Sequence, residues 1–579
     1  MDEESLLEPR KYYESHLKTL HQENASTFFD ELVDKSGINI EENKKTITEL
    51  NKVKQKIAKC EKKKTKFKTY KAILIVLIIL VLICSIINVW NLVEGNDVVI
   101  NIVLLVVSIV LFAISLYLIF KKINVEIKKY DKLLEDLEKK KEDFLETAQK
   151  QMEPLNKLYD WGICSMLAGK TCPLIKFDKN FNPQRYEFLH ERFDFNEDIE
   201  DNISTVFVQS GEILGNPFLF QKRFVQKMQD KTYSGSIVIH WTTTQYVNGK
   251  SQRVSHSETL VATVVRPKPY YYLDTWLIYG NDAAPKLSFS RSPSTANSMN
   301  EKEIDRFVRK SEKKLDNMVK NDMGDKDGNG SEFMRLANTK FESLFKAYNR
   351  NNELEFRLLF TPLAQQNIID LITNKKPYGD DFTFIKKSKI NYIRSEHAQH
   401  NDISGNPIQF FHYDYELAKK QFVSINENYF QSVFFDFAPL ISIPLYQQHK
   451  TKEYIYNETY ETNITKFEHE VLANALGQSK FVHPQTNTAA ILKAVDGTKD
   501  GKKDRVKILA HTFKEEPRVK YIEKFGGDGH LHSIPVHYYE YIPLTQETII
   551  GAEEVDNSSQ TESNNDIIKQ RGLMAYIIK

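Results

Sequence analysis

Two long apolar runs near the start of the chain give its clearest hydrophobic pattern. Residues 72–93 and 98–120 carry no charged side chain, and only the four residues from Glu94 to Asp97 separate them. A helix of about 22 residues is roughly 33 Å long, enough to cross the ~30 Å hydrocarbon core of a bilayer. The runs therefore predict two transmembrane helices joined as a hairpin, with a pair of buried core helices as the alternative. Neither run holds an ionisable residue of the kind that marks an ion path, which favours an anchor.

Lysine residues flank the two runs on the same side of the predicted membrane. Residues 51–70 are rich in lysine, and the chain continues after the second run with Lys121 and Lys122. The link between the runs carries only Glu94 and Asp97 as charged residues. Because lysine-rich flanks stay on the cytoplasmic side, we expect a cell-membrane protein with two spans and both termini in the cytoplasm.

A heptad pattern of apolar positions continues both runs away from the membrane. Before the first run these positions are Thr46, Leu50, Val53, Ile57, Cys60, Lys64 and Phe67, and after the second they are Ile123, Ile127, Tyr130, Leu134, Leu137, Lys141, Phe144 and Ala148. Steps of three and four predict an antiparallel coiled-coil stalk formed by residues 42–71 and 121–153, with Ile57 beside Leu134. Pro154 would end the second helix. Two amphipathic helices that pack on the globular part are the alternative.

Beyond residue 160 the pattern changes to mixed helix and strand. It predicts an α+β cytosolic region with antiparallel sheets, divided into domains at 160–300 and 331–550. Residues 233–247 and 251–265 alternate in polarity around Asn248-Gly249, a strong signal for a β-hairpin with Trp241 opposite His256. We expect the sequence Arg266 to Pro269 to end the second strand, with a further strand at 270–279.

The remaining elements are predicted from periodicity and from Gly and Pro residues. We expect helices at 302–321, 331–349, 362–373 and 413–437, the last ended by Pro439, and a strand at 354–360. Strands at 489–495, 505–513, 518–525 and 531–543 would form an antiparallel meander. Residues 1–41 form an N-terminal helical segment in this interpretation, and the polar residues 551–567 are expected to be disordered.

Charge and cysteine content narrow the class of protein. The 79 Lys and Arg residues balance 78 Asp and Glu residues, giving a net charge of +1. A dedicated nucleic-acid binder carries a clear basic excess, so we expect no nucleic-acid partner. Four cysteines without paired spacing exclude a disulfide scaffold and are typical of a reducing compartment.

A histidine-rich segment, GGDGHLHSIPVHYYEY, is the strongest candidate for chemistry. On a strand, His530 and His532 share a face, as ligands of a first-row metal often do. A bulge at Pro535 would bring His537 into phase with them, and Asp528 precedes the group. Asp528, His530, His532 and His537 therefore form a candidate metal site, with surface histidines on a strand as the alternative. The sequence predicts no other cofactor.

Two further motifs resemble known sites only in part. Gly169-Lys170-Thr171 looks like the end of a phosphate-binding loop, but that motif requires glycine where this chain has Cys164. Residues 325–331 match the first half of a calcium loop, whereas the bidentate Glu expected at its twelfth position is Leu336. A weak calcium site and a solvated loop are both consistent with this composition.

Other residues with chemical potential favour structural roles. His397 and His400 would share a helix face, but their region reads as strand and loop. Cys164 and Cys172 lie too far apart for a redox pair and are expected to fill the core. The chain contains no hydrolase, zinc-protease, dinucleotide or kinase motif, so the sequence favours a non-enzymatic role.

Three segments resemble a family of two-span bacterial membrane proteins with a large cytosolic domain. They are LIYGNDAAPKLSFSRSPS (277–294), FESLFKAYNRNNELEFRLLFTPLAQQN (341–367) and NENYFQSVFFDFAPLISIPLYQQ (426–448). The family occurs in low-GC Gram-positive bacteria and their wall-less relatives, and its members are sometimes labelled transporter permeases. The resemblance covers most of the cytosolic part and implies no established activity. Two spans without intramembrane charge argue against a permease.

These observations favour a membrane-anchored cytosolic scaffold or binding protein. Its expected partners are the lipid bilayer and a cytosolic or membrane protein, with homo-oligomerisation as a further expectation. A membrane-bound enzyme of unrecognised type, metal-dependent through the histidine-rich segment, is one alternative. An oligomeric pore or defence effector built from the two spans is the other.

Overall fold

The computed structural model describes residues 7–93, 98–196, 200–247, 250–324, 333–450, 464–500, 503–555, 567–570 and 572–578. It combines helices with antiparallel sheets, so the fold class is α+β. The chain forms two compact units: unit 1 is Met1–Ala25, Asp160–Pro407 and Ile425–Lys579, and unit 2 is Ser26–Tyr159 and Ile408–Ser424. The predicted turns at 94–97 and 248–249, the calcium-loop segment 325–331 and residues 556–566 of the predicted disordered tail lie outside the described residues.

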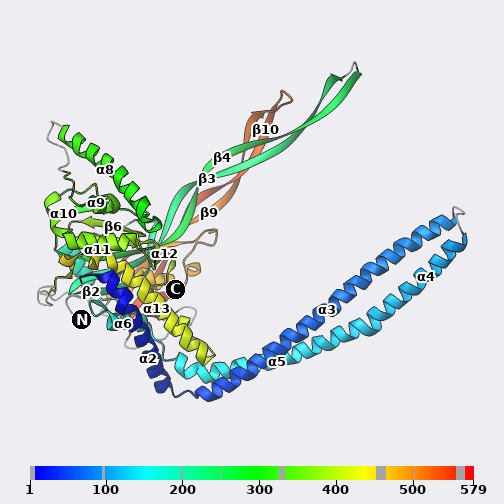
Figure 1. Ribbon diagram of the computed structural model, residues 1–579, viewed down its shortest axis with the longest axis horizontal. Helices are drawn as coiled ribbons and strands as arrows, with labels where there is room; N and C mark the ends of the chain where they lie inside the picture. Colours follow the sequence, from blue (N-terminus) through cyan, green and yellow to red (C-terminus); the bar gives the residue numbers. More distant parts are fainter. Residues whose placement is uncertain are drawn as a thin grey trace. The chain divides into compact units, whose positions relative to one another are not determined.

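Unit 2 contains two long helical stretches (Figure 1). They comprise α3 (Ile40–Val93), α4 (Val98–Tyr117), the π-helical turn η3 (Leu118–Ile123) and α5 (Asn124–Asn156). Two helical stretches, Ile40–Asn91 and Val99–Asn156, are long and apolar enough to cross a membrane. Apolar side chains of α4 are exposed, for example Val99 at 76% and Ile109 at 57%. Such exposure is unfavourable in water and is expected of a helix that contacts lipid.

Side chains of α3 contact those of α4 and α5 in reverse order along the chain. The pairs are Ile57 with Leu134 in an apolar cluster, Lys64 with Asp131, Phe67 with Tyr130, and Ser85 with Ser108. Residue numbers therefore rise along α3 as they fall in its partners. Near the end of α5, buried Ala148 packs against Ile47 and Leu50 of α3.

Unit 1 contains two antiparallel sheets. The seven-stranded sheet has the order β1-β2-β3-β4-β7-β6-β5 and the five-stranded sheet the order β11-β12-β10-β9-β8. The strands of the first are β1 (Ile175–Phe177), β2 (Ile203–Ile213), β3 (Asn216–Val247), β4 (Lys250–Gly280), β5 (Ser288–Arg291), β6 (Phe382–Lys387) and β7 (Ile390–Ser395). Those of the second are β8 (Ile491–Asp500), β9 (Lys503–Phe525), β10 (Leu531–Glu554), β11 (Ile567–Gln570) and β12 (Leu573–Ile578).

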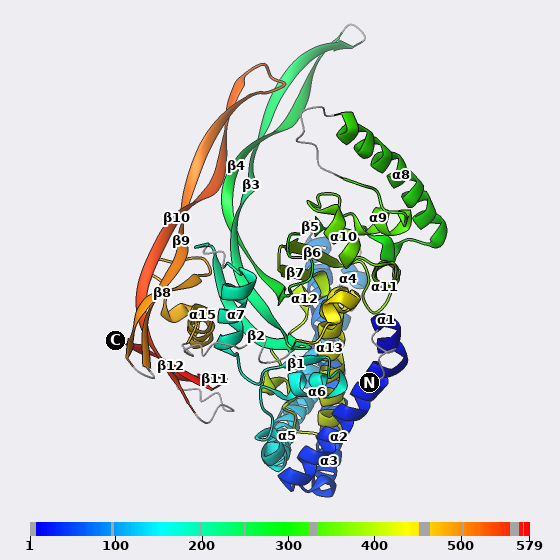
Figure 2. The same cartoon turned by 90° about the vertical axis from the view of Figure 1, so that its left-hand side faces the viewer.

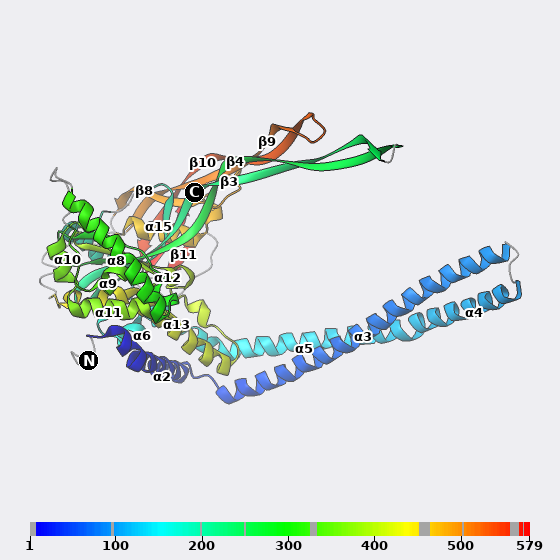
Figure 3. The same ribbon diagram turned by 45° about the horizontal axis from the view of Figure 1, so that its top comes forward.

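Strands β3 and β4 form one long two-stranded ribbon, and β9 and β10 form another (Figure 2). Figure 3 shows the two ribbons side by side within unit 1. Their facing sides bury an apolar cluster that includes Ile239, Leu260, Ile534 and Val536. The backbones approach so closely that a Cβ built at Gly235 would lie 2.1 Å from the carbonyl oxygen of Pro535. Each ribbon therefore buries one face against the other, which a lone hairpin in water could not do.

Helices cover both faces of the seven-stranded sheet. The remaining helices are α1 (Pro9–Tyr12), η2 (Tyr13–Leu17), α2 (Lys18–Ser36), α6 (Ile163–Thr171), α7 (Pro183–Phe193), η4 (Ala296–Ser298), α8 (Glu301–Gly324), α9 (Thr339–Phe345), α10 (Glu353–Leu359), α11 (Pro362–Thr373), α12 (Glu396–His400), η5 (Pro407–Phe410), α13 (Tyr415–Ile441), η6 (Pro444–Gln447), α15 (Lys466–Leu476) and η7 (Gln478–Lys480). On one face Phe188 of α7 and Phe467 of α15 pack with Ile278 and Ile390. On the other, Phe437 of α13 packs edge-to-face on Phe218 of β3.

The strand predicted at 354–360 is a helix, α10, so that prediction was wrong. Alternate positions in LEFRLLF are apolar, which reads as a strand, but Leu354 is 80% exposed. The buried residues are Phe356, Leu359 and Phe360, which share one helical face. Asn352 caps the helix by accepting a hydrogen bond from the Glu355 backbone N–H. The helix predicted at 331–349 is shorter in the structure, where α9 covers Thr339–Phe345.

Several predicted breaks at proline are not breaks. Strand β4 continues through Pro267 and Pro269, and β9 continues through Pro517, so each predicted pair of strands is a single strand. Among the described residues, β4 pairs with β7 only at its end. Pro267 and Pro269 therefore lie where one edge of β4 is unpaired, and an unpaired strand edge needs no N–H donor. Helices α5 and α13 each extend two residues beyond their prolines, Pro154 and Pro439. A proline in the last turn removes one hydrogen bond and need not end the helix there.

Candidate functional site

The histidine-rich segment forms the turn between β9 and β10 and the start of β10. His532 Nε2 lies 2.9 Å from Asp528 Oδ2, and the backbone N–H of His530 donates to Asp528 Oδ1 at 3.0 Å. These hydrogen bonds lower the pKa of the Asp528 carboxyl. The structure therefore brings Asp528 and His532 together, with His530 contributing its backbone.

His537 lies apart from this group. It is five residues beyond His532 on β10, roughly 16 Å along a strand, and residues of opposite parity point to opposite faces. His532 shares a face with buried Ile534 and Val536, whereas His537 is exposed. Among the described residues, no three His, Cys, Asp or Glu side chains gather closely enough to hold a metal ion. The metal site stays a prediction.

The turn contacts the β3–β4 ribbon. The Gly527 backbone N–H donates to Glu258 Oε2 at 2.7 Å, and Lys524 Nζ donates to the Val261 carbonyl at 2.8 Å. A Cβ at Gly527 would lie 2.8 Å from the indole of Trp241, so the backbone approaches the ring as only glycine allows. Trp241 stacks on His256 directly across the ribbon, which confirms the predicted cross-strand pair. The glycines of this segment thus have a structural role in joining the ribbons.

His397 occupies a different environment from the one predicted. It lies on the short helix α12, so the prediction of strand and loop for this region was wrong: β7 ends at Ser395, directly before it. His397 Nδ1 lies 2.6 Å from Asp381 Oδ2, and Nε2 lies 3.3 Å from Asp436 Oδ1. Burial alone would lower the pKa of His397, but the two carboxylates raise it to about 11. His400 is exposed on the same helix and pairs only with Glu396 among the described residues.

The other sequence motifs occupy structural positions. Gly169, Lys170 and Thr171 end helix α6, whereas a phosphate loop precedes a helix. Cys164 and Cys172 are buried, and burial raises the pKa of the Cys172 thiol to about 12. Neither thiol is therefore a ready nucleophile.

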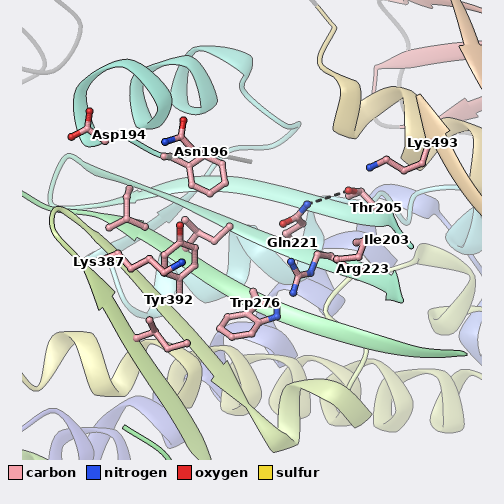
Figure 4. A pocket seen from close by; sticks show the side chains of 14 residues that line it. Asp194, Asn196, Ile203, Thr205, Gln221, Arg223, Trp276, Lys387, Tyr392 and Lys493 are labelled. Carbon is pink, nitrogen blue, oxygen red and sulfur yellow. Dashed lines mark hydrogen bonds between the residues drawn. The ribbon is translucent and has the colours of Figure 1, made fainter. Parts of the chain in front are cut away.

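A cavity of about 320 Å³ lies on the face of the seven-stranded sheet that α7 covers. Figure 4 shows its side chains, which come from β2, β3, β4, β6, β7 and β8 and from the segment after α7. Asp194 ends α7 in the left-handed conformation (φ 58°), which turns the chain so that Asp194, Phe195 and Asn196 form one wall. Strand β8 contributes Lys493 on another side.

Three cationic side chains line the cavity: Arg223, Lys387 and Lys493. Asp194 is the one carboxylate among its described lining residues. Arg223 Nη2 donates to Asp274 Oδ2 at 2.9 Å, while its Nε is buried without a hydrogen-bond partner among the described residues. Cationic side chains therefore outnumber carboxylates in the described lining.

Two acidic residues outside the described lining hold two of these cations, Arg223 and Lys493, in place. Asp274 accepts hydrogen bonds from Trp276, Arg394 and Arg223; burial alone would raise its pKa, and these bonds hold it below the usual value. Glu470 lies 3.0 Å from Lys493 Nζ and also accepts the Thr205 backbone N–H at 2.7 Å. Burial raises the pKa of Glu470, opposed by Lys493. Arg223 and Lys493 are thus positioned by buried partners.

Apolar and neutral polar side chains form the rest of the lining; the polar ones include Asn196, Thr205 and Gln221. Trp276 and Tyr392 meet edge-to-face at 6.3 Å and 86°. The Arg223 guanidinium lies 5.5 Å from the centre of the Trp276 ring, and Lys387 Nζ lies 5.7 Å from that of Tyr392. Isoleucines line the cavity between these rings and the sheet: Ile203, Ile278, Ile385 and Ile390. Polar and apolar side chains thus share the lining, which suits a ligand with both a polar and an apolar part.

Sequence reasoning missed this cavity entirely. Its lining comes from seven parts of the chain between residues 194 and 493, and no local motif connects them. The alternation of polar and apolar residues in β3 predicts a strand but does not show what faces Arg223.

Comparison with known proteins gives no further information on the site: no family model, curated protein or solved structure matches the chain.

Proposed function

We propose that this protein is a membrane-anchored binding protein, in which α3 and α4 form a transmembrane hairpin and unit 1 binds a ligand in the cytoplasm. The observation that carries the proposal is the continuous exposure of apolar side chains on the uncharged helix α4. A soluble protein would bury such a surface, because each large apolar side chain contributes about 1.5–3 kcal/mol when it leaves water.

The order of contacts along α3 supports an antiparallel hairpin and a coiled-coil stalk. Ile57 and Leu134 share an apolar cluster, and the Lys64 ammonium lies 2.5 Å from Asp131. A charged pair is costly in the hydrocarbon core, whereas the pair nearer the predicted outer end is the uncharged Ser85 with Ser108. The change from charged to uncharged pairs supports a membrane boundary between them.

Lysine residues support the orientation with both termini in the cytoplasm. They lie before α3 becomes apolar and at Lys121 and Lys122 of η3. Both groups belong to the same side of a hairpin, and this bias sets the orientation of short membrane segments.

The cavity in unit 1 supports a binding function. Buried acidic partners hold two of its three lining cations, Arg223 and Lys493, and cations fixed in this way orient a bound ligand.

The anchor is tested by alkaline extraction of membranes that contain the full chain. We expect the protein to stay in the membrane pellet at high pH and to be released only by detergent. Protease added to right-side-out vesicles should leave unit 1 intact. Release into the alkaline supernatant, or cleavage of unit 1 from outside, would contradict the proposal.

The stalk is tested by oxidative crosslinking. Ile57→Cys combined with Leu134→Cys, in a chain with Cys60 and Cys84 changed to serine, should give a disulfide within one chain. The matched control combines Ile57→Cys with Leu133→Cys, because Leu133 is exposed and adjacent. Equal crosslinking in both pairs, or products only between chains, would contradict an intramolecular stalk.

A further inference from the structure

We propose that the cavity lined by Arg223, Lys387 and Lys493 binds a small organic oxyanion, a carboxylate or phosphate ester carried on a planar ring. The inference rests on the proposed function, since it names the ligand class of the same binding site. It follows from three features of the cavity: its charge, the fixed geometry of its cations, and its aromatic walls.

The charge of the cavity selects an anion. Three cationic side chains face one described carboxylate, Asp194, and they come from separate strands, β3, β6 and β8. Asp274 and Glu470 pair with Arg223 and Lys493 from outside the described lining, whereas Lys387 has no ion-pair partner among the described residues, so a bound anion would pair with it. A cationic ligand would be repelled by Lys387.

The geometry of Arg223 favours an oxyanion over a halide. Asp274 holds one end of the guanidinium through Nη2, and this carboxylate also accepts from Arg394 Nε at 2.6 Å. Arg223 Nε is buried and lacks a hydrogen-bond partner among the described residues. Arg223 lines the cavity, so a carboxylate or phosphate there can accept from a guanidinium that Asp274 already holds, in a geometry that a halide cannot match.

Lys493 and Lys387 provide two further points of attachment. Glu470 fixes Lys493 at 3.0 Å and is itself held by the Thr205 and Ala494 backbone N–H groups at 2.7 and 3.4 Å. In Figure 4 the Lys493 ammonium points from β8 toward the side of the cavity where Arg223 lies. Lys387 enters from the opposite side, beside Tyr392.

The walls between these cations select a planar apolar group. Trp276 is held by its Nε1 hydrogen bond to Asp274 at 2.6 Å, and Tyr392 meets it edge-to-face. Rings fixed in this way offer flat apolar surfaces, while the isoleucines exclude water. A cavity of about 320 Å³ is at the small end of the range for ligand sites, so it accommodates one or two rings and an anionic group.

The inference is tested with matched pairs of compounds on the full chain in detergent micelles. One pair is 2-naphthoate and its neutral amide, and the other is adenosine 5′-monophosphate and adenosine; acetate and inorganic phosphate supply the anion without a ring. Equilibrium dialysis against protein-free micelles gives each Kd. We expect at least one planar oxyanion to bind at least tenfold more tightly than its neutral partner and than the ring-free anion. Which pair responds distinguishes a carboxylate from a phosphate ester.

Variants locate the binding. Lys387→Gln should weaken oxyanion binding roughly tenfold, the loss of one charge-assisted contact, and leave neutral partners unaffected. Lys387 is exposed, so the variant should fold normally; Lys520→Gln, an equally exposed strand lysine outside the cavity, is the matched control. Glu470→Gln tests positioning: oxyanion binding should weaken because Lys493 loses its partner, with no change in the neutral compounds.

Three results would overturn the inference. Neutral partners that bind as tightly as the oxyanions, or oxyanion binding unchanged by Lys387→Gln, would show that the ligand class is wrong while a binding protein remains. Binding of none of the six compounds would also reject it. Failure of the anchor is a separate result, because alkaline extraction detects it without any ligand.

Discussion

The apolar helix α4 and the α+β unit 1 differ in where their apolar and charged side chains lie. α4 exposes valine, isoleucine and leucine side chains along its length and contains no charged residue. Unit 1 buries its apolar side chains and buries charged groups with them: Arg291 and Asp380, for example, form an ion pair in which neither side chain is exposed. Apolar side chains are therefore exposed to the surroundings in α4 and buried in the core of unit 1.

The difference bears on the medium proposed for each region. In unit 1, buried charged groups such as Arg291 and Asp380 are paired, which offsets the cost of taking them out of water. Phe289 illustrates the core of unit 1, lying within 5.7 Å, between ring centres, of Phe345, Phe356 and Phe360. α4 has no comparable covering among the described residues of unit 2, and apolar side chains exposed in this way are expected where a helix contacts lipid.

The comparison is tested most strongly by adding charge to each region. Val106→Asp with Ile109→Asp places two carboxylates near the middle of the proposed span, at a cost of about 5–7 kcal/mol. We expect most of this variant to leave the membrane on alkaline extraction. The matched control is Val238→Asp with Val261→Asp, also exposed but on the β3–β4 ribbon, with an expected change within about 0.5 kcal/mol at each site. Equal effects in the two variants would remove the contrast.

The second test breaks a buried charge group in unit 1. His397→Ala leaves Asp381 and the buried Asp436 without their shared partner, so we expect unfolding to become easier by about 3–5 kcal/mol. His400→Ala is the matched control on the same helix and should change the melting temperature little, because His400 is exposed. A similar loss in both variants would point to damage to α12 rather than to the ion pairs.

The dependence of stability on pH identifies the charge on His397. Its pKa in the folded protein is raised to about 11, against ~6.5 in an unfolded chain. A raised pKa means that the folded state holds the proton more tightly, so this stabilisation is complete below about pH 6.5 and is lost as the pH rises to about 11. We expect the difference in unfolding free energy between the wild-type protein and His397→Gln to shrink between pH 6.5 and 10. A constant difference would mean that His397 is neutral when folded.

Local patterns in the sequence were sufficient for the regions in which neighbouring residues decide the structure. The apolar runs at 72–93 and 98–120 need only their own composition to form helices. Alternation on both sides of Asn248-Gly249 predicts the register of β3 and β4, including Trp241 opposite His256, because hairpin pairing follows from the turn. The α+β class with antiparallel sheets followed from the same signals.

The candidate site could not be predicted in this way, because distant residues form it. Arg223 acquires its role from Asp274 on the next strand and from Lys493, which β8 brings near. His397 likewise depends on Asp436 of α13. From Leu354 onward, apolar residues recur at alternate positions, as they would in a strand. Only the burial of Phe356 beside an exposed Leu354 shows that this segment is a helix. Tertiary contacts decide such positions, and no window of neighbouring residues contains them.

The third test concerns the ribbons, where exposed apolar side chains are compatible with water. Gly235→Ala would place a Cβ 2.1 Å from the Pro535 carbonyl oxygen, so one ribbon must move away from the other. We expect a loss of about 1–3 kcal/mol in thermal unfolding, the usual cost of overpacking. Ser236→Ala, the exposed next residue on β3, should be nearly neutral. An unchanged melting temperature in Gly235→Ala would show that the ribbons are not packed in solution.

The smallest expected effect concerns two side-chain pairs within the helices, one proposed to lie in lipid and the other in water. Ser85 Oγ donates to Ser108 Oγ at 2.8 Å in the apolar part, and Lys64 pairs with Asp131 further along. Double-mutant cycles with Ser85→Ala and Ser108→Ala should give a coupling of about 0.6 kcal/mol, and cycles with Lys64→Met and Asp131→Asn about 0.2–1 kcal/mol. Raising the salt concentration should reduce only the second coupling, because mobile ions screen charges in water and do not enter the hydrocarbon core. If salt changed neither coupling, the Lys64–Asp131 pair would not lie in water and the membrane boundary proposed between the two pairs would be wrong.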